Sequence, residues 1–243
     1  MSIPQNLLSL LKLIESDAEF TGTIPKIRSS TGKAFFVKQG SPSESEQYTG
    51  EAESLKAIHR AAPGLAPMVL ASGISDDNKP YFISEYKDIT SLGEDASKTL
   101  AKRLATELHV YKSTEGFGFS VPTYCGATRM ENGWFESWEK CYAAKIEELL
   151  KELRSRGHRY QALCEKGERI KNDLAIARIF GGFSSAFFAE YHKHLPKTEP
   201  QEQYGLRGEL YELYHYLNHT VLFGGGYASS AMKKMDTLLK AGL

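Results

Sequence analysis

Strand-like and helix-like segments occupy different parts of this chain, and their separation limits the folds that it can adopt. Short apolar runs bounded by turn residues indicate strands, whereas apolar residues at spacings of three and four indicate helices. Strand patterns lie before residue 88, with one helical pattern inserted among them, and helical patterns follow from about residue 95 onward. This order predicts an α+β fold of two lobes, with a small β-rich N-lobe over residues 1–88 and a helical C-lobe over residues 89–243.

The N-lobe pattern is a hairpin followed by one helix and two further strands. Residues 22–38 predict two strands around a Ser-Ser-Thr-Gly turn, and the second strand ends at Lys38. Residues 41–64 predict a helix, because they begin with Ser-Pro, continue with acidic residues and end at Pro-Gly. Short strands are expected in residues 66–74 and 79–88, on either side of the turn Ser-Asp-Asp-Asn.

The remaining periodic segments predict helices, with one glycine-rich interruption. An amphipathic first helix is expected near the N-terminus, where the residues that share one face are Leu7, Leu8, Leu11 and Ile14. The glycine-rich segment 116–133 is expected to be irregular, and Trp134 and Trp138 are expected on one face of the helix after it. The helices expected in the C-lobe cover residues 95–113, 134–156, 173–195, 206–223 and 228–242.

Composition excludes several classes of function. Basic and acidic residues number 30 each, and this balance argues against a nucleic-acid-binding protein, which needs a basic face. No apolar run is long enough to cross a bilayer, so no membrane partner is expected. Three widely spaced cysteines fit free thiols in a reducing compartment better than a disulfide framework. We therefore expect a soluble, cytoplasmic protein.

Lys38 and Glu51 are the first candidate site residues. Kinases hold the phosphates of ATP with a lysine on a strand, and a helix carboxylate holds that lysine in place. Lys38 closes its strand, and Glu51 comes early in the helix that follows. A lysine at a strand end is by itself more often an exposed surface charge. The order of strand lysine, helix glutamate and two further strands favours a nucleotide site.

The end of the last N-lobe strand supplies the other candidates. In a kinase the chain crosses here to the helical lobe, and its main chain hydrogen-bonds adenine. Glu85, Tyr86 and Lys87 occupy this position, although an ordinary strand end fits these residues equally well. A glycine-rich phosphate loop is not expected, because Gly22 and Gly32 are not in a Gly-x-Gly context.

Eight stretches of the chain carry a family resemblance. They are "FFVK", "GEAESLKAI", "YFISEYKD", "LATELH", "GFGF", "WFESWEK", "FGGFSSAFFAEYHKHLPK" and "LYELYHYLNH". They resemble the fructosamine/ketosamine-3-kinase family, whose members include protein-ribulosamine 3-kinases, and most closely its fungal branch.

The resemblance implies an aminoglycoside phosphotransferase-type, protein-kinase-like fold. It also implies transfer of a phosphoryl group from ATP, with Mg²⁺, to the 3-hydroxyl of ketoamine sugars on amines or glycated proteins. By this resemblance Lys38 and Glu51 form the nucleotide ion pair, and the segment after Phe82 is the hinge.

The chain departs from the family where the catalytic residues belong. The family carries a His-Gly-Asp loop with a downstream asparagine, and then an Asp-Pro-Ala loop whose aspartate binds magnesium. Residues 164–183 cross this region without either motif, so the C-lobe is expected to be incomplete. From His109 to the C-terminus the only aspartates are Asp173 and Asp236, and both are expected in helices. No catalytic residue and no metal ligand is therefore assigned.

Three interpretations of the activity remain open. In the first, the chain is a ketosamine 3-kinase whose catalytic groups come from an unidentified source. In the second, it is a catalytically inactive pseudokinase or binding module, and in the third it is the product of a gene model that omits an exon. A separate zinc site is a weaker alternative. His215 and His219 have the i, i+4 spacing of a helical zinc pair, but Tyr216 stands where a zinc protease has its glutamate.

Overall fold

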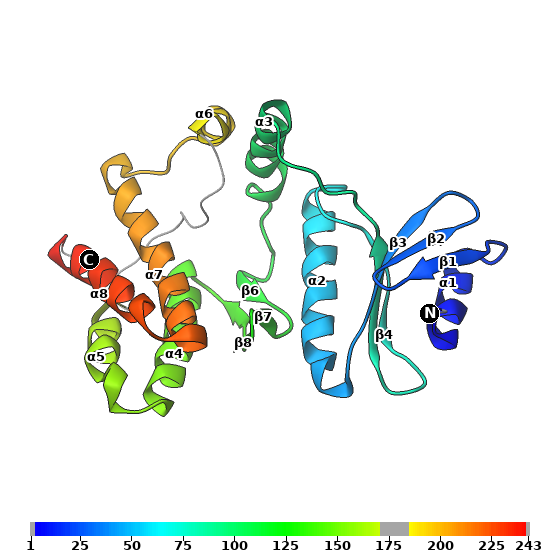
Figure 1. The fold of residues 1–243 in the computed structure, drawn as a ribbon. Helices are drawn as coiled ribbons and strands as arrows, with labels where there is room; N and C mark the ends of the chain where they lie inside the picture. Colours follow the sequence, from blue (N-terminus) through cyan, green and yellow to red (C-terminus); the bar gives the residue numbers. More distant parts are fainter. Residues whose placement is uncertain (1–2, 171–184, 242–243) are drawn as a thin grey trace. The chain divides into compact units, whose positions relative to one another are not determined.

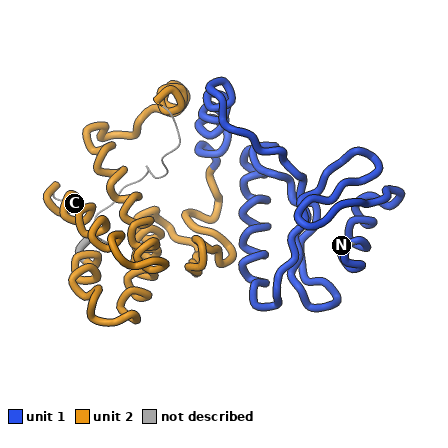
Figure 2. Tube along the Cα trace, in the orientation of Figure 1, with its two compact units in different colours: residues 1–111 blue, residues 112–243 orange. Residues whose placement is uncertain are grey.

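The computed structural model describes residues 3–170 and 185–241, and the chain divides into two compact units, Met1–Tyr111 and Lys112–Leu243 (Figure 2). The first unit extends beyond residue 88 because it includes helix α3 (Glu94–Arg103). Arg103 donates a hydrogen bond from Nη2 to the carbonyl of Pro63, at 2.7 Å. The lobe boundary at residue 88 stays a prediction.

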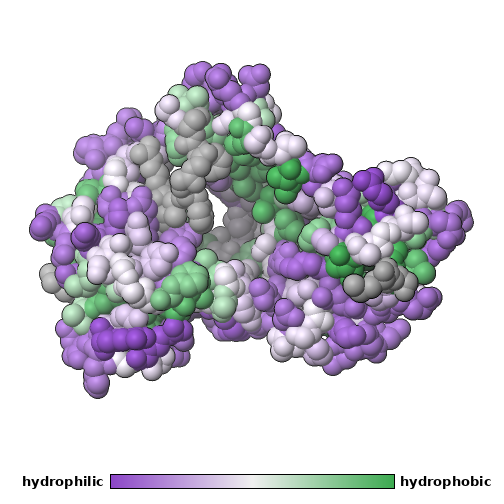
Figure 3. Space-filling view, in the orientation of Figure 1, coloured by the Kyte–Doolittle hydropathy of each residue, from purple (hydrophilic) through white to green (hydrophobic). Residues whose placement is uncertain are grey.

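Hydrophilic residues cover most of the visible surface of each unit (Figure 3).

A five-stranded antiparallel sheet in the order β1-β2-β3-β5-β4 forms the first unit (Figure 1). The expected hairpin is confirmed as β2 and β3, and the two later strands as β4 and β5. The sequence pattern missed β1, because this short strand contains Gly22 and buries no side chain. The strands are β1 (Phe20–Thr23), β2 (Lys26–Ser29), β3 (Ala34–Gln39), β4 (Val69–Ile74) and β5 (Pro80–Glu85).

Two helices cover the two faces of this sheet (Figure 1). Successive side chains of a strand point to opposite faces, so β3 contributes to both layers. On one face Phe35 packs against the buried leucines of α1 (Gln5–Ile14), which confirms the N-terminal helix. On the other face Phe36 packs against the core that includes α2 (Ser45–Ala61), which confirms the second expected helix. Lys38 follows Phe36 by two residues and therefore lies on the α2 face.

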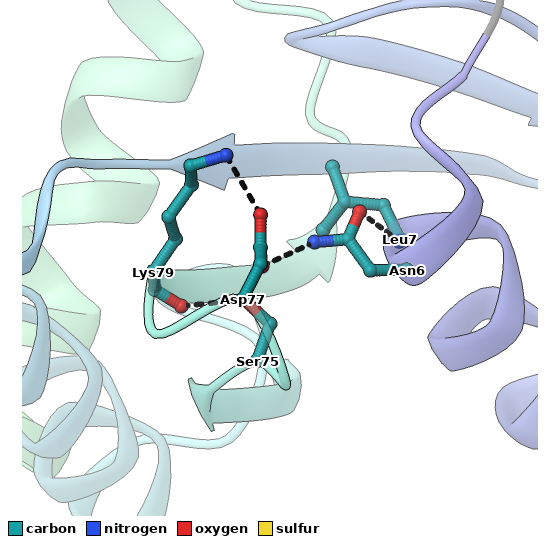
Figure 4. A network of polar contacts seen from close by, with 5 residues as sticks. All are labelled: Asn6, Leu7, Ser75, Asp77 and Lys79. Carbon is teal, nitrogen blue, oxygen red and sulfur yellow. Dashed lines mark hydrogen bonds and ion pairs between the residues drawn. The ribbon is translucent and has the colours of Figure 1, made fainter.

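A polar network fixes α1 to the turn between β4 and β5 (Figure 4). Asn6 Nδ2 and Ser75 Oγ both donate to Asp77 Oδ1, at 2.8 and 2.6 Å. Lys79 Nζ donates to Asp77 Oδ2 at 2.7 Å. These contacts, with Lys79 the largest cause, lower the pKa of Asp77 to about 2. The carboxylate of Asp77 thus holds both the turn and the start of the helix.

Helices dominate the second unit, as expected. α7 and α8 pack against each other and against α4 and α5 around one buried core, in which Leu213 and Leu217 are fully buried. Gly224, with a positive φ of 66°, ends α7 after Phe223, which is also the last residue of the expected helix. The expected helix over 173–195 is seen as α6 from Ser185, and residues 173–184 lie outside the described residues. The longer helices are α4 (Trp138–Ser155), α5 (Gln161–Ile170), α6 (Ser185–His194), α7 (Tyr204–Phe223) and α8 (Gly226–Lys240).

The segment expected to be irregular instead contains two small two-stranded sheets, so that prediction was wrong. β6 pairs with β9, and β7 pairs with β8 between them. Gly118 allows the close approach in the outer pair, because a Cβ there would lie 1.7 Å from the carbonyl oxygen of Gly133. Trp134 lies in β9 and not in α4, so it does not share a helix face with Trp138. The strands are β6 (Phe117–Phe119), β7 (Thr123–Cys125), β8 (Thr128–Met130) and β9 (Gly133–Phe135).

Over residues 3–170 and 185–241, no helix combines the length and the apolar character needed to cross a membrane. The three cysteines, Cys125, Cys141 and Cys164, are all free.

Candidate functional site

Lys38 and Glu51 form an ion pair on the α2 face of the sheet. Lys38 Nζ donates to Glu51 Oε2 at 2.7 Å, and the two side chains remain 35% and 37% exposed. β3 supplies the lysine, and α2 supplies the carboxylate two turns from its start. The pairing expected from the sequence is therefore present in the structure. Partial exposure leaves the ammonium group accessible to a further anion.

The start of α2 is fixed next to this pair. Ser41 and Glu44 form a capping box around the short helix η1 (Pro42–Glu44), which leads directly into α2. Glu44 Oε2 accepts hydrogen bonds from the Ser41 N–H at 2.7 Å and from the Ser41 hydroxyl at 2.8 Å. These bonds lower the pKa of Glu44, and the charge of Lys38 adds to the effect. The cap sets where α2 begins and hence where Glu51 stands.

Tyr48 is a site residue that the sequence analysis did not identify. Its ring lies in the first turns of α2, is only 7% exposed, and has its centroid 4.9 Å from Lys38 Nζ. Tyr48 precedes Glu51 by three residues, which places both on one side of the helix. The spacing of Tyr48 and Glu51 is visible in the sequence, but it indicates a site only when the structure places Lys38 beside the ring.

Glu85, Tyr86 and Lys87 lie where the sheet ladder ends. The N–H groups of Glu85 and Tyr86 donate to the carbonyls of Met68 and Ala34, at 3.0 and 3.1 Å. These two N–H groups are therefore used by the sheet. The Glu85 carbonyl also accepts a hydrogen bond from the Ser84 hydroxyl, at 3.2 Å, so both main-chain polar groups of Glu85 have partners.

The side chains of this segment make local contacts. Glu85 pairs with Lys87 at 2.8 Å, and this bond, with a second one from the Met68 N–H, lowers the pKa of Glu85. The ring of Tyr86 lies under Lys26, whose Nζ is 3.9 Å from the ring centroid. These contacts stabilise the segment itself, and none of them involves Lys38.

The described residues offer few groups for a catalytic metal. Within residues 3–170 and 185–241, no three His, Cys, Asp or Glu side chains converge as a metal site. Asp236 lies on α8 and pairs with Lys166 at 2.6 Å, and Asp173 lies outside the described residues. His219 is one of the two histidines with zinc-pair spacing. Its ring stacks on the rings of Phe223 and Tyr227, and its centroid lies 5.7 and 5.0 Å from theirs.

The donor set on the α2 face suits a nucleotide phosphate. A partly exposed ammonium group, restrained by a carboxylate, gives a fixed positive charge that a phosphate oxygen can approach. Mg²⁺ accompanies ATP in such sites and neutralises charge that develops on the transferred phosphoryl group. Within the part of the chain that the structure describes, no cluster of three His, Cys, Asp or Glu side chains offers protein ligands for Mg²⁺.

Comparison with known sequences gives consistent matches. A family model described as fructosamine kinase matches the chain in two pieces, residues 14–172 and 167–241. The chain is 28% identical to a chloroplastic protein-ribulosamine 3-kinase of Arabidopsis thaliana over 254 residues, covering 85% of this chain and 76% of the relative. It is also 28% identical to a ketosamine-3-kinase of Mus musculus over 274 residues, covering 84% and 88% respectively.

Two crystal structures share the fold. A protein of Haemophilus somnus 129PT assigned as a fructosamine-3-kinase superposes with a TM-score of 0.73 at 16% identity, over 97% of each chain. A second, from Thermobifida fusca YX-ER1, has a TM-score of 0.70 at 18% identity, over 92% of this chain and 93% of the other. These matches confirm the predicted kinase-like α+β fold.

Proposed function

Since the family match extends over most of its length, the chain belongs to the fructosamine kinase family, and from this premise we propose that it binds ATP at the Lys38–Glu51 pair. The observation that carries the proposal is the 2.7 Å contact between these side chains on the α2 face. Lys38 contacts the phosphates, Glu51 restrains Lys38, and the main chain around Glu85, Tyr86 and Lys87 receives adenine. The sugar ligands proposed for the chain are ketoamines on amines or glycated proteins, in keeping with the names of the relatives.

ATP titration tests this proposal. Calorimetry with purified chain, with and without Mg²⁺, should give saturable binding. Lack of saturable binding under both conditions would refute the proposal.

We propose further that phosphoryl transfer by this chain is absent or very slow. Transfer in this fold needs one aspartate to orient the acceptor hydroxyl and a second to hold the metal, and the only aspartates after His109 are Asp173 and Asp236. Asp236 is engaged with Lys166. Loss of a general base alone costs about 10²–10⁴-fold in rate. On this proposal the chain is a nucleotide-binding relative that retains the kinase fold.

Two features of the comparisons support a missing catalytic segment. The family match breaks at residues 167–172, within the region where the sequence lacks both expected loops. The alignment with the Arabidopsis protein runs over 254 positions, more than the 243 residues of this chain, although it covers only 85% of the chain. The relative therefore contains residues that have no counterpart here.

The same features fit a gene model that omits an exon. Sequencing the transcript across the codons for residues 164–183 separates the two explanations. A transcript that encodes additional residues with a His-Gly-Asp motif would assign kinase activity to the longer protein. A transcript identical to the present sequence would support the non-catalytic relative.

The free cysteines support a reducing compartment, and the cytoplasm remains the proposed location.

A further inference from the structure

The ring of Tyr48 lies against the ammonium group that is proposed to meet ATP. Lys38 Nζ is 4.9 Å from the ring centroid and 2.7 Å from Glu51 Oε2. A cation over an aromatic ring within about 6 Å is attracted by the negative face of the ring. The ammonium group is therefore held by two neighbours on α2, a carboxylate and an aromatic ring.

Gly40 leaves the space that the ring of Tyr48 occupies. A Cβ at Gly40 would lie 2.7 Å from Cε2 and 2.9 Å from Cζ of Tyr48, and 3.0 Å from Glu44 Oε2. The backbone at Gly40 is fixed by its N–H, which donates to the Pro80 carbonyl at 3.0 Å, and its φ lies outside the left-handed region. Glycine is thus required at this position by the ring and not by the backbone conformation.

Burial is the main influence on the ionisation of Tyr48. It raises the pKa of the Tyr48 hydroxyl, the charge of Lys38 acts in the opposite direction, and Glu44 and Glu51 raise it further. The phenol is therefore neutral at neutral pH, and its ring face is available to the cation.

We propose that Tyr48 is a positioning residue that holds Lys38 in the conformation that receives the ATP phosphates, an inference that rests on the proposed nucleotide site. A lysine side chain loses substantial rotamer freedom when it is fixed by a ligand. Because the ring already restrains Lys38 before ATP binds, less rotamer freedom is lost on binding. The contact therefore strengthens nucleotide binding through Lys38, without Tyr48 itself touching the reacting atoms.

The test compares Tyr48→Leu, which removes the ring, with Tyr48→Phe, which keeps it. ATP affinity is measured by calorimetry. In parallel, acetylation of Lys38 in the nucleotide-free chain is followed by peptide mass spectrometry, with Lys56 as internal reference because its exposure is similar, 39% against 35%. Phe20→Leu, which removes a ring on the opposite face of the sheet, is the matched control.

We expect Tyr48→Leu to weaken ATP binding about 3- to 10-fold and to raise the acetylation of Lys38 relative to Lys56 severalfold. Tyr48→Phe and Phe20→Leu should leave both quantities near wild type. Unchanged affinity and labelling in Tyr48→Leu would overturn the inference, as would equal losses in Tyr48→Phe. If Tyr48→Leu does not fold, Gly40→Ala displaces the ring instead and should give the same two changes. If wild type does not bind ATP, the proposed function fails, and the labelling ratio still decides whether Tyr48 restrains Lys38.

Discussion

Replacing Lys38 with methionine should separate nucleotide binding from stability. The substitution keeps an unbranched side chain that is one atom shorter and removes its charge, and so removes the proposed contact with the phosphates. Two unit charges 4 Å apart near a protein surface interact by about 4 kcal/mol before desolvation is counted. Hydrogen bonds to charged groups contribute a net amount of about 1.5–3 kcal/mol. ATP affinity should therefore fall by about 10- to 150-fold.

The free energy of unfolding should change far less. The Lys38–Glu51 pair is more than a third exposed on both sides, and exposed ion pairs contribute about 0–1 kcal/mol. Glu51 can also be solvated when its partner is removed. Urea unfolding followed by circular dichroism should thus detect a loss below about 1 kcal/mol in Lys38→Met.

Lys56→Met is the matched control for this experiment. Lys56 pairs with Glu53 on the same helix, at the same 2.7 Å and with 39% and 36% exposure. We expect this variant to have wild-type ATP affinity and a similarly small change in stability. The reasoning is refuted if Lys38→Met binds ATP as tightly as wild type, or if Lys56→Met weakens binding equally.

Three further predictions concern the framework. The depressed pKa of Asp77, about 2 against about 3.9 in an unfolded chain, contributes stability that is present above pH 4 and lost as the pH falls towards 2. Asp77→Asn should flatten the dependence of the melting temperature on pH in this range, and an unchanged slope would contradict the assignment. Leu213→Ala should lower the free energy of unfolding by about 2–5 kcal/mol in urea titrations, because Leu213 is fully buried, and a loss below about 1 kcal/mol would exclude a tightly packed core there. Gly118→Ala should destabilise the second unit by more than about 1 kcal/mol in the same titrations, whereas Gly205→Ala, which has open space around it, should not.

Sequence patterns predicted the elements that depend on local periodicity. The hairpin before Lys38, the α2 helix and the long helices of the second unit have apolar spacing or capping residues that identify them. The Lys38–Glu51 contact followed from the order of strand and helix, since a strand lysine and a helix glutamate in this arrangement meet across the sheet face. The Lys38–Glu51 contact could therefore be predicted from the sequence alone.

The missed elements depend on contacts that the local sequence does not encode. β1 and the strands β6 to β9 are only three or four residues long, and β1, β6 and β9 contain glycine, so their apolar patterns are too short to identify them as strands. They are stabilised by pairing: β1 pairs with β2, β6 pairs with β9 across the intervening residues, and β7 pairs with β8. Tyr48 was missed for the same reason, because its role depends on Gly40 and Lys38, which reach it through the fold.

The central claim is that this chain keeps a nucleotide clamp without the carboxylates that phosphoryl transfer needs. The most direct measurement incubates the purified 243-residue protein with ATP, Mg²⁺ and a fructosyl-lysine or ribulosyl-lysine peptide, and follows the peptide mass over time. We predict ATP binding that depends on Lys38 and no increase in phosphorylated peptide above the control without protein. Accumulation of a peptide carrying a phosphate on the sugar 3-hydroxyl, in step with ATP consumption, would contradict the claim.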